Sequence, residues 1–231
     1  MTFPKSEFKF IDRGFKDLLV LIPGWATDSR IFSGLNLDYN YLLTTSLYPF
    51  DFKKALFDKI EKTEKVSLFG WSLGGFLAAE FAQDYPQKIN ELILLSIREK
   101  FEAKGLEDIK LKLNKNKNTY LYKFYRECFY GNGEEAFNWF KENLLNEYLE
   151  KIELKELIFG LNYFASTAIC PADLMSLAKI KIFHGKEDQI VSLEEAIKIK
   201  SKIPHAEFIC LEDAGHLPFL STQFRKWFYH G

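Results

Sequence analysis

A serine between two glycines is the residue of this sequence with the clearest chemical potential. Residues 70–74 read Gly-Trp-Ser-Leu-Gly, which matches the G-x-S-x-G pattern of a serine on a sharp turn between a strand and a helix. An apolar run at 66–69 precedes the pattern and an Ala-rich segment follows it from residue 73. We therefore predict that Ser72 is a nucleophile whose hydroxyl projects above the carboxyl edge of a sheet. The alternative is a tight turn with no chemistry.

A serine nucleophile needs a base within hydrogen-bond reach, and that base needs a partner that fixes its tautomer. His216 follows the last apolar run and is expected at the same sheet edge as Ser72. We expect a packed or backbone-bonded role for His184, a position at the opposite edge for His205, and a terminal position for His230. His216 is therefore the predicted general base.

Three carboxylates compete for the role of orienting the histidine. Asp188 lies in a segment that follows the apolar run at 180–183, so it is expected at the carboxyl edge of the sheet. Glu187 is an adjacent rival, and Asp213 lies close to His216 in the sequence. We favour Asp188, because Asp213 is too close to His216 in the sequence to reach its far ring nitrogen. The resulting chain order of serine, acid and histidine is the order expected with this type of turn.

The tetrahedral intermediate of acyl transfer needs N–H donors directed at its oxyanion. Leu73, the residue after the nucleophile, supplies one backbone N–H. The second is expected from Trp25, which follows an early apolar run and a Pro-Gly pair at 23–24. A simple turn is the alternative interpretation of that pair.

Apolar runs bounded by turn residues recur along the chain and indicate buried strands, and helical spacing separates most of them. This alternation predicts an α/β protein with a mostly parallel sheet and helices on both faces. The expected strands are 18–22, 41–45, 66–69, 92–95, 180–183 and 207–211, and the expected helices are 52–62, 73–85, 193–201 and 222–229.

The strand signal stops between the fourth and fifth runs. Residues 98–179 are helical in spacing, charged and aromatic, so we predict an inserted helical cap over a core formed by residues 1–97 and 180–231. Most of the aromatic rings are expected to form the core of this small helical unit. A few should face the cleft beneath.

Composition bounds the remaining possibilities. The 231 residues carry 31 basic and 32 acidic side chains, so no global charge indicates a nucleic-acid or membrane partner. Three widely spaced cysteines lack the spacing of a disulfide framework or a zinc site. We expect neither a leader nor a membrane span, because residues 1–7 form no apolar stretch and no later run reaches about 18 apolar residues. We expect a cytoplasmic monomer without metal or cofactor.

At these residues the sequence resembles the α/β-hydrolase superfamily and, more narrowly, the pimeloyl-acyl carrier protein methyl ester carboxylesterases of biotin synthesis. The closer features are Gly24-Trp25, the tryptophan of the 70–75 motif, the segment 184–191, and Ala-Gly-His-Leu-Pro-Phe-Leu-Ser at 214–221. The resemblance implies Ser72, Asp188 and His216 as catalytic triad, with oxyanion donors on Trp25 and Leu73. It also implies Trp71 as a wall of the substrate pocket.

The charge of the cap is unevenly distributed. Residues 104–126 hold seven basic and two acidic side chains, whereas eight glutamates and three lysines lie in 127–156. We predict that the basic stretch docks an acidic acyl carrier protein while its acyl chain enters the cleft; plain solvated helix surface is the alternative. The candidate docking residues are Lys112, Lys115, Lys117, Lys123 and Arg126.

The sequence is compatible with three functions. The first is hydrolysis of the methyl ester of a carrier-linked dicarboxylic acyl chain, through an acyl-enzyme, in biotin synthesis. The second is a general short-chain carboxylesterase or lactonase, which would not depend on the basic stretch. The third is a binding protein without catalysis on the same fold.

Overall fold

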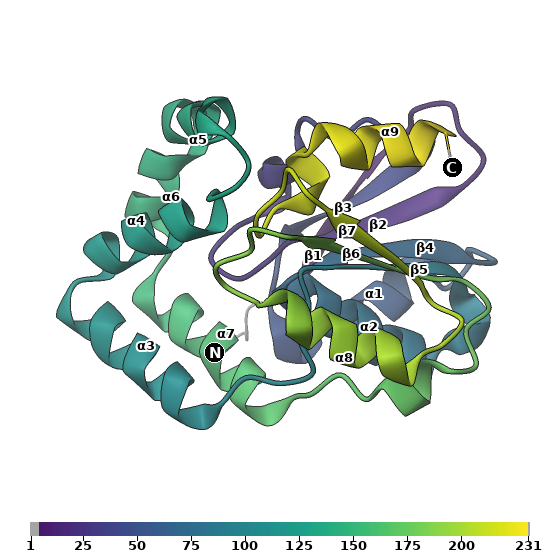
Figure 1. Ribbon diagram of the computed structural model, residues 1–231. Helices are drawn as coiled ribbons and strands as arrows, with labels where there is room; N and C mark the ends of the chain where they lie inside the picture. The colour runs from purple at the N-terminus through teal and green to yellow at the C-terminus, as the bar shows by residue number, and fades with distance from the viewer. Residues whose placement is uncertain (1–4, 231) are drawn as a thin grey trace.

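A computed structural model describes residues 5–230 of the protein. For residues 229 and 230 it describes the backbone only. Residues 1–4 and 231 of the predicted core lie outside this range. Within it, seven strands form one sheet in the order β1-β3-β2-β4-β5-β6-β7 (Figure 1). The strands are β1 (Glu7–Ile11), β2 (Leu18–Ile22), β3 (Asn40–Ser46), β4 (Val66–Trp71), β5 (Ile89–Leu95), β6 (Ile180–Gly185) and β7 (Glu207–Leu211).

The sheet is parallel except at one edge, where β1 runs antiparallel to β3. Every residue of β4 is buried, as expected for a central strand that is covered on both faces. The six strands predicted from apolar runs are all present. The edge strand β1 was not predicted, because its side chains are mostly exposed and give no buried apolar run.

Helices cover both faces of the sheet, as predicted. In Figure 1, α1, α2 and α8 lie on one face and α9 lies on the other. No helix of the described chain is long and apolar enough to cross a membrane. The four helices are α1 (Pro49–Ile60), α2 (Leu73–Asp84), α8 (Leu193–Lys202) and α9 (Thr222–His230).

The chain between β5 and β6 contains helices and loops and stands to one side of the sheet (Figure 1). We call residues 98–179 the insertion. A π-helical turn at Lys141–Leu145 joins its third and fourth helices. The helices are α3 (Ala103–Lys115), α4 (Lys117–Cys128), α5 (Glu134–Phe140), α6 (Asn146–Lys151) and α7 (Leu154–Ser166).

Aromatic side chains form the core of the insertion. The ring of Phe140 lies 4.9 Å from that of Tyr125, 4.8 Å from that of Phe129 and 5.8 Å from that of Tyr148. All four side chains are buried. Rings at these distances contribute stability beyond their buried area, so the insertion has a small apolar core of its own.

Candidate active site

Ser72 occupies a sharp turn between β4 and α2. Its backbone has φ 53° and ψ −114°, a left-handed conformation that costs a residue with a side chain about 1–3 kcal/mol. The turn is tight: a Cβ atom at Gly74 would collide with the backbone of Ile22 and Pro23. The end of β2 therefore packs directly against the turn that presents Ser72.

His216 and Asp188 meet at the carboxyl edge of the sheet, in the loops after β7 and β6. Nδ1 of His216 donates to Oδ2 of Asp188 at 2.8 Å. The other carboxylate oxygen of Asp188 accepts the backbone N–H groups of Ile190 at 2.8 Å and Val191 at 2.9 Å. Both oxygens of Asp188 are therefore engaged, and they hold the imidazole with Nε2 as the free nitrogen.

The electrostatics of this pair favour an ionised acid. Burial raises the pKa of the Asp188 carboxyl, but the charge and the hydrogen bond of His216 outweigh burial and keep the pKa below its usual value. Among the described residues, Nε2 of His216 is one of four buried side-chain atoms without a hydrogen-bond partner. A buried nitrogen without a hydrogen-bond partner carries a free-energy cost. A hydrogen bond that Nε2 accepts from a serine hydroxyl or from a substrate would remove this cost.

Neither of the two rival carboxylates contacts His216. The side chain of Glu187 is exposed. Asp213 accepts hydrogen bonds from the hydroxyls of Ser221 at 2.5 Å and Thr222 at 3.1 Å, at the start of α9. Asp188 is thus the carboxylate that the structure brings to the histidine.

The other histidines have structural partners. Nε2 of His184 donates to the carbonyl of Val191 at 3.0 Å, and the side chain is fully buried, as expected. Nε2 of His205 lies 2.9 Å from the carbonyl oxygen of Leu177. The side chain of His230 lies outside the described part of the structure.

Trp71 lies behind the histidine. Its indole N–H donates to the carbonyl of His216 at 2.6 Å, and its ring contacts those of His216 at 5.6 Å and Phe219 at 5.5 Å. Only 2% of its surface is exposed. Trp71 therefore supports the loop that carries His216 from inside the core. The resemblance implied that Trp71 forms a wall of the substrate pocket, but Trp71 does not line the cavity beside the nucleophile turn.

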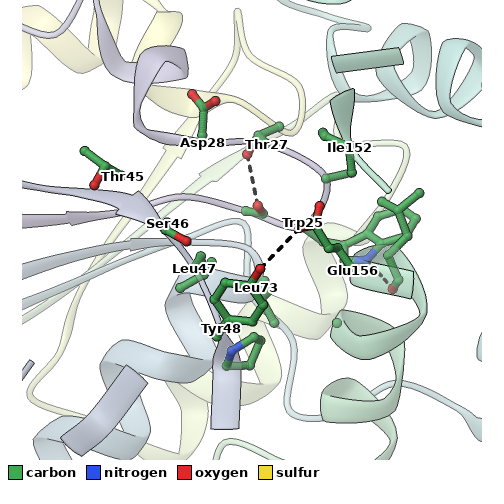
Figure 2. A pocket seen from close by; sticks show the side chains of 15 residues that line it. Trp25, Thr27, Asp28, Thr45, Ser46, Leu47, Tyr48, Leu73, Ile152 and Glu156 are labelled. Carbon is green, nitrogen blue, oxygen red and sulfur yellow. Dashed lines mark hydrogen bonds between the residues drawn. The ribbon is translucent and has the colours of Figure 1, made fainter. Parts of the chain in front are cut away.

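A cavity of about 240 Å³ opens beside the nucleophile turn (Figure 2). Gly24, Trp25 and Leu73 line it, and a Cβ atom at Gly24 would lie 3.3 Å from the Cβ of Ser72. Leu73 is the first residue of α2, and the first N–H groups of a helix have no acceptor within the helix. The two residues predicted to supply oxyanion donors thus line one cavity next to Ser72.

The far wall of the cavity comes from α7 of the insertion. The indole N–H of Trp25 donates to the carbonyl of Leu157 at 3.0 Å, and the hydroxyl of Tyr48 donates to Oε1 of Glu156 at 3.2 Å. Figure 2 shows both hydrogen bonds at the rim. Sequence reasoning did not identify Tyr48 or Glu156, because no motif links two residues 108 positions apart.

The cavity is acidic. Among its described lining residues, Asp28 and Glu156 carry negative charge, and no lysine, arginine or histidine is present. Asp28 is neutralised by Arg30 at 2.7 Å. Oε2 of Glu156 accepts the backbone N–H of Glu153 at 3.2 Å. The nearby ammonium group of Lys155 interacts with Glu156 electrostatically but forms its ion pair with Glu153, at 2.6 Å.

The five predicted docking residues differ in their surroundings. Lys112, Lys115, Lys123 and Arg126 are exposed on α3 and α4, and none of them forms an ion pair with another residue in the described range. The side chain of Lys117 is half-buried instead, and its Nζ donates to the carbonyl of Ile152 at 2.7 Å. Lys117 therefore stabilises the end of α6.

Comparison with known proteins identifies the class. Residues 51–222 match the alpha/beta hydrolase fold family. The chain belongs to this family, and together with its fold the match makes it a hydrolase.

Two curated relatives and one solved structure narrow the comparison. A 2-hydroxy-6-oxononadienedioate/2-hydroxy-6-oxononatrienedioate hydrolase from Paraburkholderia phymatum is 25% identical over 93% of this chain and 75% of its own length. A pimeloyl-[acyl-carrier protein] methyl ester esterase from Nitrosomonas europaea is 24% identical over 88% and 90%. An esterase from Exiguobacterium antarcticum shares the fold with a TM-score of 0.81, at 17% identity over 97% and 93%.

Proposed function

We propose that this protein hydrolyses carboxylic esters through an acyl-enzyme on Ser72. The observation that carries the proposal is the hydrogen bond between Asp188 and Nδ1 of His216, which leaves Nε2 of that histidine buried and unpaired. Nε2 accepts the Ser72 proton as Oγ attacks the ester carbonyl carbon. The backbone N–H groups of Leu73 and Trp25 stabilise the resulting oxyanion.

The remaining steps use the same groups. When the tetrahedral intermediate collapses, the bond to the alkoxy oxygen breaks and His216 returns its proton to the leaving alcohol. Water then loses a proton to His216 and attacks the acyl carbon, and the proton passes to Ser72 as the carboxylic acid leaves. Asp188 stabilises the imidazolium in both halves of the reaction.

The substrate that we propose is the methyl ester of a dicarboxylic acyl chain linked to a carrier protein, as in biotin synthesis. Relatives named as pimeloyl-[acyl-carrier protein] methyl ester esterases support this choice. The charge of the cavity also supports this substrate, because the carboxylate of Glu156 repels a substrate whose reacting end carries a free carboxylate. A methyl ester end is uncharged, whereas the dioate in the name of the Paraburkholderia phymatum relative is an anion.

The exposed basic side chains of α3 and α4 would dock the acidic carrier protein. Charges of this kind act mainly on the association rate and its salt dependence. We name Lys112, Lys115, Lys123 and Arg126 as the docking set and leave out Lys117, because its ammonium group already bonds to Ile152. The docking set lies on the insertion, whose α7 forms one wall of the cavity.

A comparison of free and carrier-linked methyl pimeloyl esters tests this proposal. Replacing the docking set by alanine should lower kcat/KM for the carrier-linked ester about tenfold or more at low salt, and the loss should shrink above about 0.5 M salt. A matched control replaces four exposed lysines that lie away from the insertion. These are Lys16, Lys59, Lys62 and Lys65.

The control variant and the hydrolysis of free esters by both variants should remain unchanged. Equal losses on free and linked esters would contradict the docking role. No loss on either would favour the second candidate, a general short-chain carboxylesterase or lactonase. The small cavity favours that candidate as well, because pockets for drug-sized ligands measure roughly 300–1,000 Å³. Failure of Ser72 to react with a fluorophosphonate probe would indicate a binding protein without catalysis.

A further inference from the structure

A short stretch of the insertion is hydrogen-bonded to the loop that carries His216. We call residues 212–217, which follow β7, the histidine loop. We call residues 128–132, which run from the last residue of α4 into the loop before α5, the clamp. The backbone N–H of His216 donates to the carbonyl of Cys128 at 3.2 Å. Cys128 is the last residue of α4.

The side chain of Asn132 spans the histidine. Its Oδ1 accepts the backbone N–H of Gly215 at 3.2 Å, and its Nδ2 donates to the carbonyl of Leu217 at 2.9 Å. One amide thus satisfies a donor on one side of His216 and an acceptor on the other. Together with Cys128, the clamp engages three consecutive residues of the histidine loop.

The two segments are in direct backbone contact. A Cβ atom at Gly215 would collide with the carbonyl oxygen of Tyr130, and one at Gly131 would lie 2.5 Å from the Cβ of Glu187. Glycine is therefore required at residue 215 for the clamp to reach the loop. Close packing of this kind permits little independent movement of the loop.

The core holds the opposite side of the same loop. The indole of Trp71 donates to the carbonyl of His216, and the backbone N–H of Glu187 donates to the carbonyl of Ala214 at 3.0 Å. These contacts use carbonyl groups of residues 214 and 216. The N–H groups of residues 215 and 216 donate only to the clamp among the described residues, whereas the carbonyl of Leu217 accepts from Asn132 and also from the backbone N–H of Leu220 at 3.0 Å.

We infer that Asn132 is a positioning residue for His216, which the insertion supplies to the catalytic machinery of the core. The inference rests on the proposed role of His216 as the general base. Asn132 does not touch the reacting atoms; it holds the backbone on both sides of the base and thereby fixes the position of the imidazole. A displacement of about 1 Å at a catalytic group can lower the rate roughly 100-fold.

The test compares Asn132→Ala with wild type on p-nitrophenyl acetate, after titration of active sites with a fluorophosphonate probe. We expect kcat per labelled site to fall about 10- to 100-fold while KM stays within about twofold. The rate of probe labelling should fall in parallel, because labelling uses the same base. The final labelled fraction should remain complete.

A matched control and an isosteric variant sharpen the test. Asn143→Ala removes an exposed asparagine of the insertion whose Nδ2 donates to the carbonyl of Trp139 at 2.8 Å, and it should behave as wild type. Asn132→Asp keeps the size and the acceptor but cannot donate to Leu217, so it should lose about fivefold or more in kcat.

The outcomes separate this inference from the proposed function. A fall in the labelled fraction with an unchanged rate per labelled site would mean that Asn132 only stabilises the fold, and this would overturn the inference. Wild-type rates in both Asn132 variants would overturn it too. Absence of labelling in the wild-type protein would instead contradict the proposed function, on which the inference depends.

Discussion

The sheet edge and the insertion contribute to the site in different ways. At the sheet edge, Ser72, Asp188 and His216 lie in loops that directly follow β4, β6 and β7, and backbone geometry places them. The insertion reaches the site through single side chains and one stretch of backbone. It contributes Glu156 to the cavity and Asn132 to the histidine loop.

This contrast predicts which substitutions abolish ester hydrolysis and which change only its rate or its substrate preference. Substitutions at the sheet edge remove a reacting group, so the reaction itself is lost for every ester. Substitutions in the insertion leave the reacting groups in place and change charge or position around them.

The largest effect is expected from Ser72→Ala. Hydrolysis of p-nitrophenyl acetate should fall by more than about 10⁴-fold, since loss of the nucleophile of a triad costs several orders of magnitude. Alanine has the same backbone strain as serine at φ 53°, so the melting temperature should stay within about 3 °C of wild type. Retained activity above about a hundredth of wild type would move the nucleophile elsewhere.

The second effect concerns the acid. Asp188→Asn should lower kcat roughly 10³- to 10⁴-fold, because the neutral amide holds the wrong tautomer of His216. Glu187→Gln and Asp213→Asn serve as controls and should each cost less than about tenfold, since neither side chain contacts the histidine. Steady-state kinetics on one ester measure all three variants. The opposite ranking would transfer the role to another carboxylate.

A smaller effect is expected where the insertion borders the cavity. Glu156→Gln removes a negative charge from the lining. The kcat/KM ratio of an ester with a free carboxylate to the neutral ester of equal length should rise about fivefold, the equivalent of roughly 1 kcal/mol for a partly exposed pair. Glu107→Gln is the matched control, because Glu107 is exposed on α3 of the insertion, pairs with Lys110 at 2.6 Å and does not line the cavity. Equal ratios in both variants would exclude Glu156 from substrate recognition.

The smallest effect is a pH dependence of stability inside the core. Burial lowers the pKa of His184 below its usual value near 6.5. As the pH falls below about 6.5, the unfolded chain therefore takes up a proton that the folded protein does not, and the folded state loses up to about 1.4 kcal/mol per pH unit. This loss continues until the pH reaches the lowered pKa of the folded state.

The variant His184→Gln should remove this contribution. Urea titrations between pH 5 and 7.5 should show that the free energy of unfolding falls less steeply below pH 6.5 in the variant than in wild type. Asp188, whose folded pKa is lowered, stabilises the fold at all pH values above about 4 and loses that effect only in stronger acid. His184 and Asp188 thus affect stability in different pH ranges. Parallel curves for wild type and variant would contradict the prediction for His184.

Much of the core could be predicted from the sequence because its information is local. The run at 18–22 coincides with β2 residue for residue, since buried parallel strands are continuous apolar stretches. The run at 207–211 coincides with the edge strand β7, whose residues 208–210 are half-buried. The 70–74 motif predicted the strained turn at Ser72, because glycines on both sides permit it. The strand β1 escaped prediction because an exposed edge strand lacks a buried apolar run.

The sequence by itself thus determined the α/β alternation, the nucleophile turn and the order of the candidate triad, all of which depend on short-range patterns of apolar, glycine and polar residues. Only the tertiary structure decided that Trp71 supports His216, that Lys117 bonds to Ile152, and that Asn132 spans the histidine. The two contacts with the histidine loop join residues 83 to 145 positions apart. Such pairs have no spacing rule, because their geometry exists only after the insertion has packed against the sheet edge.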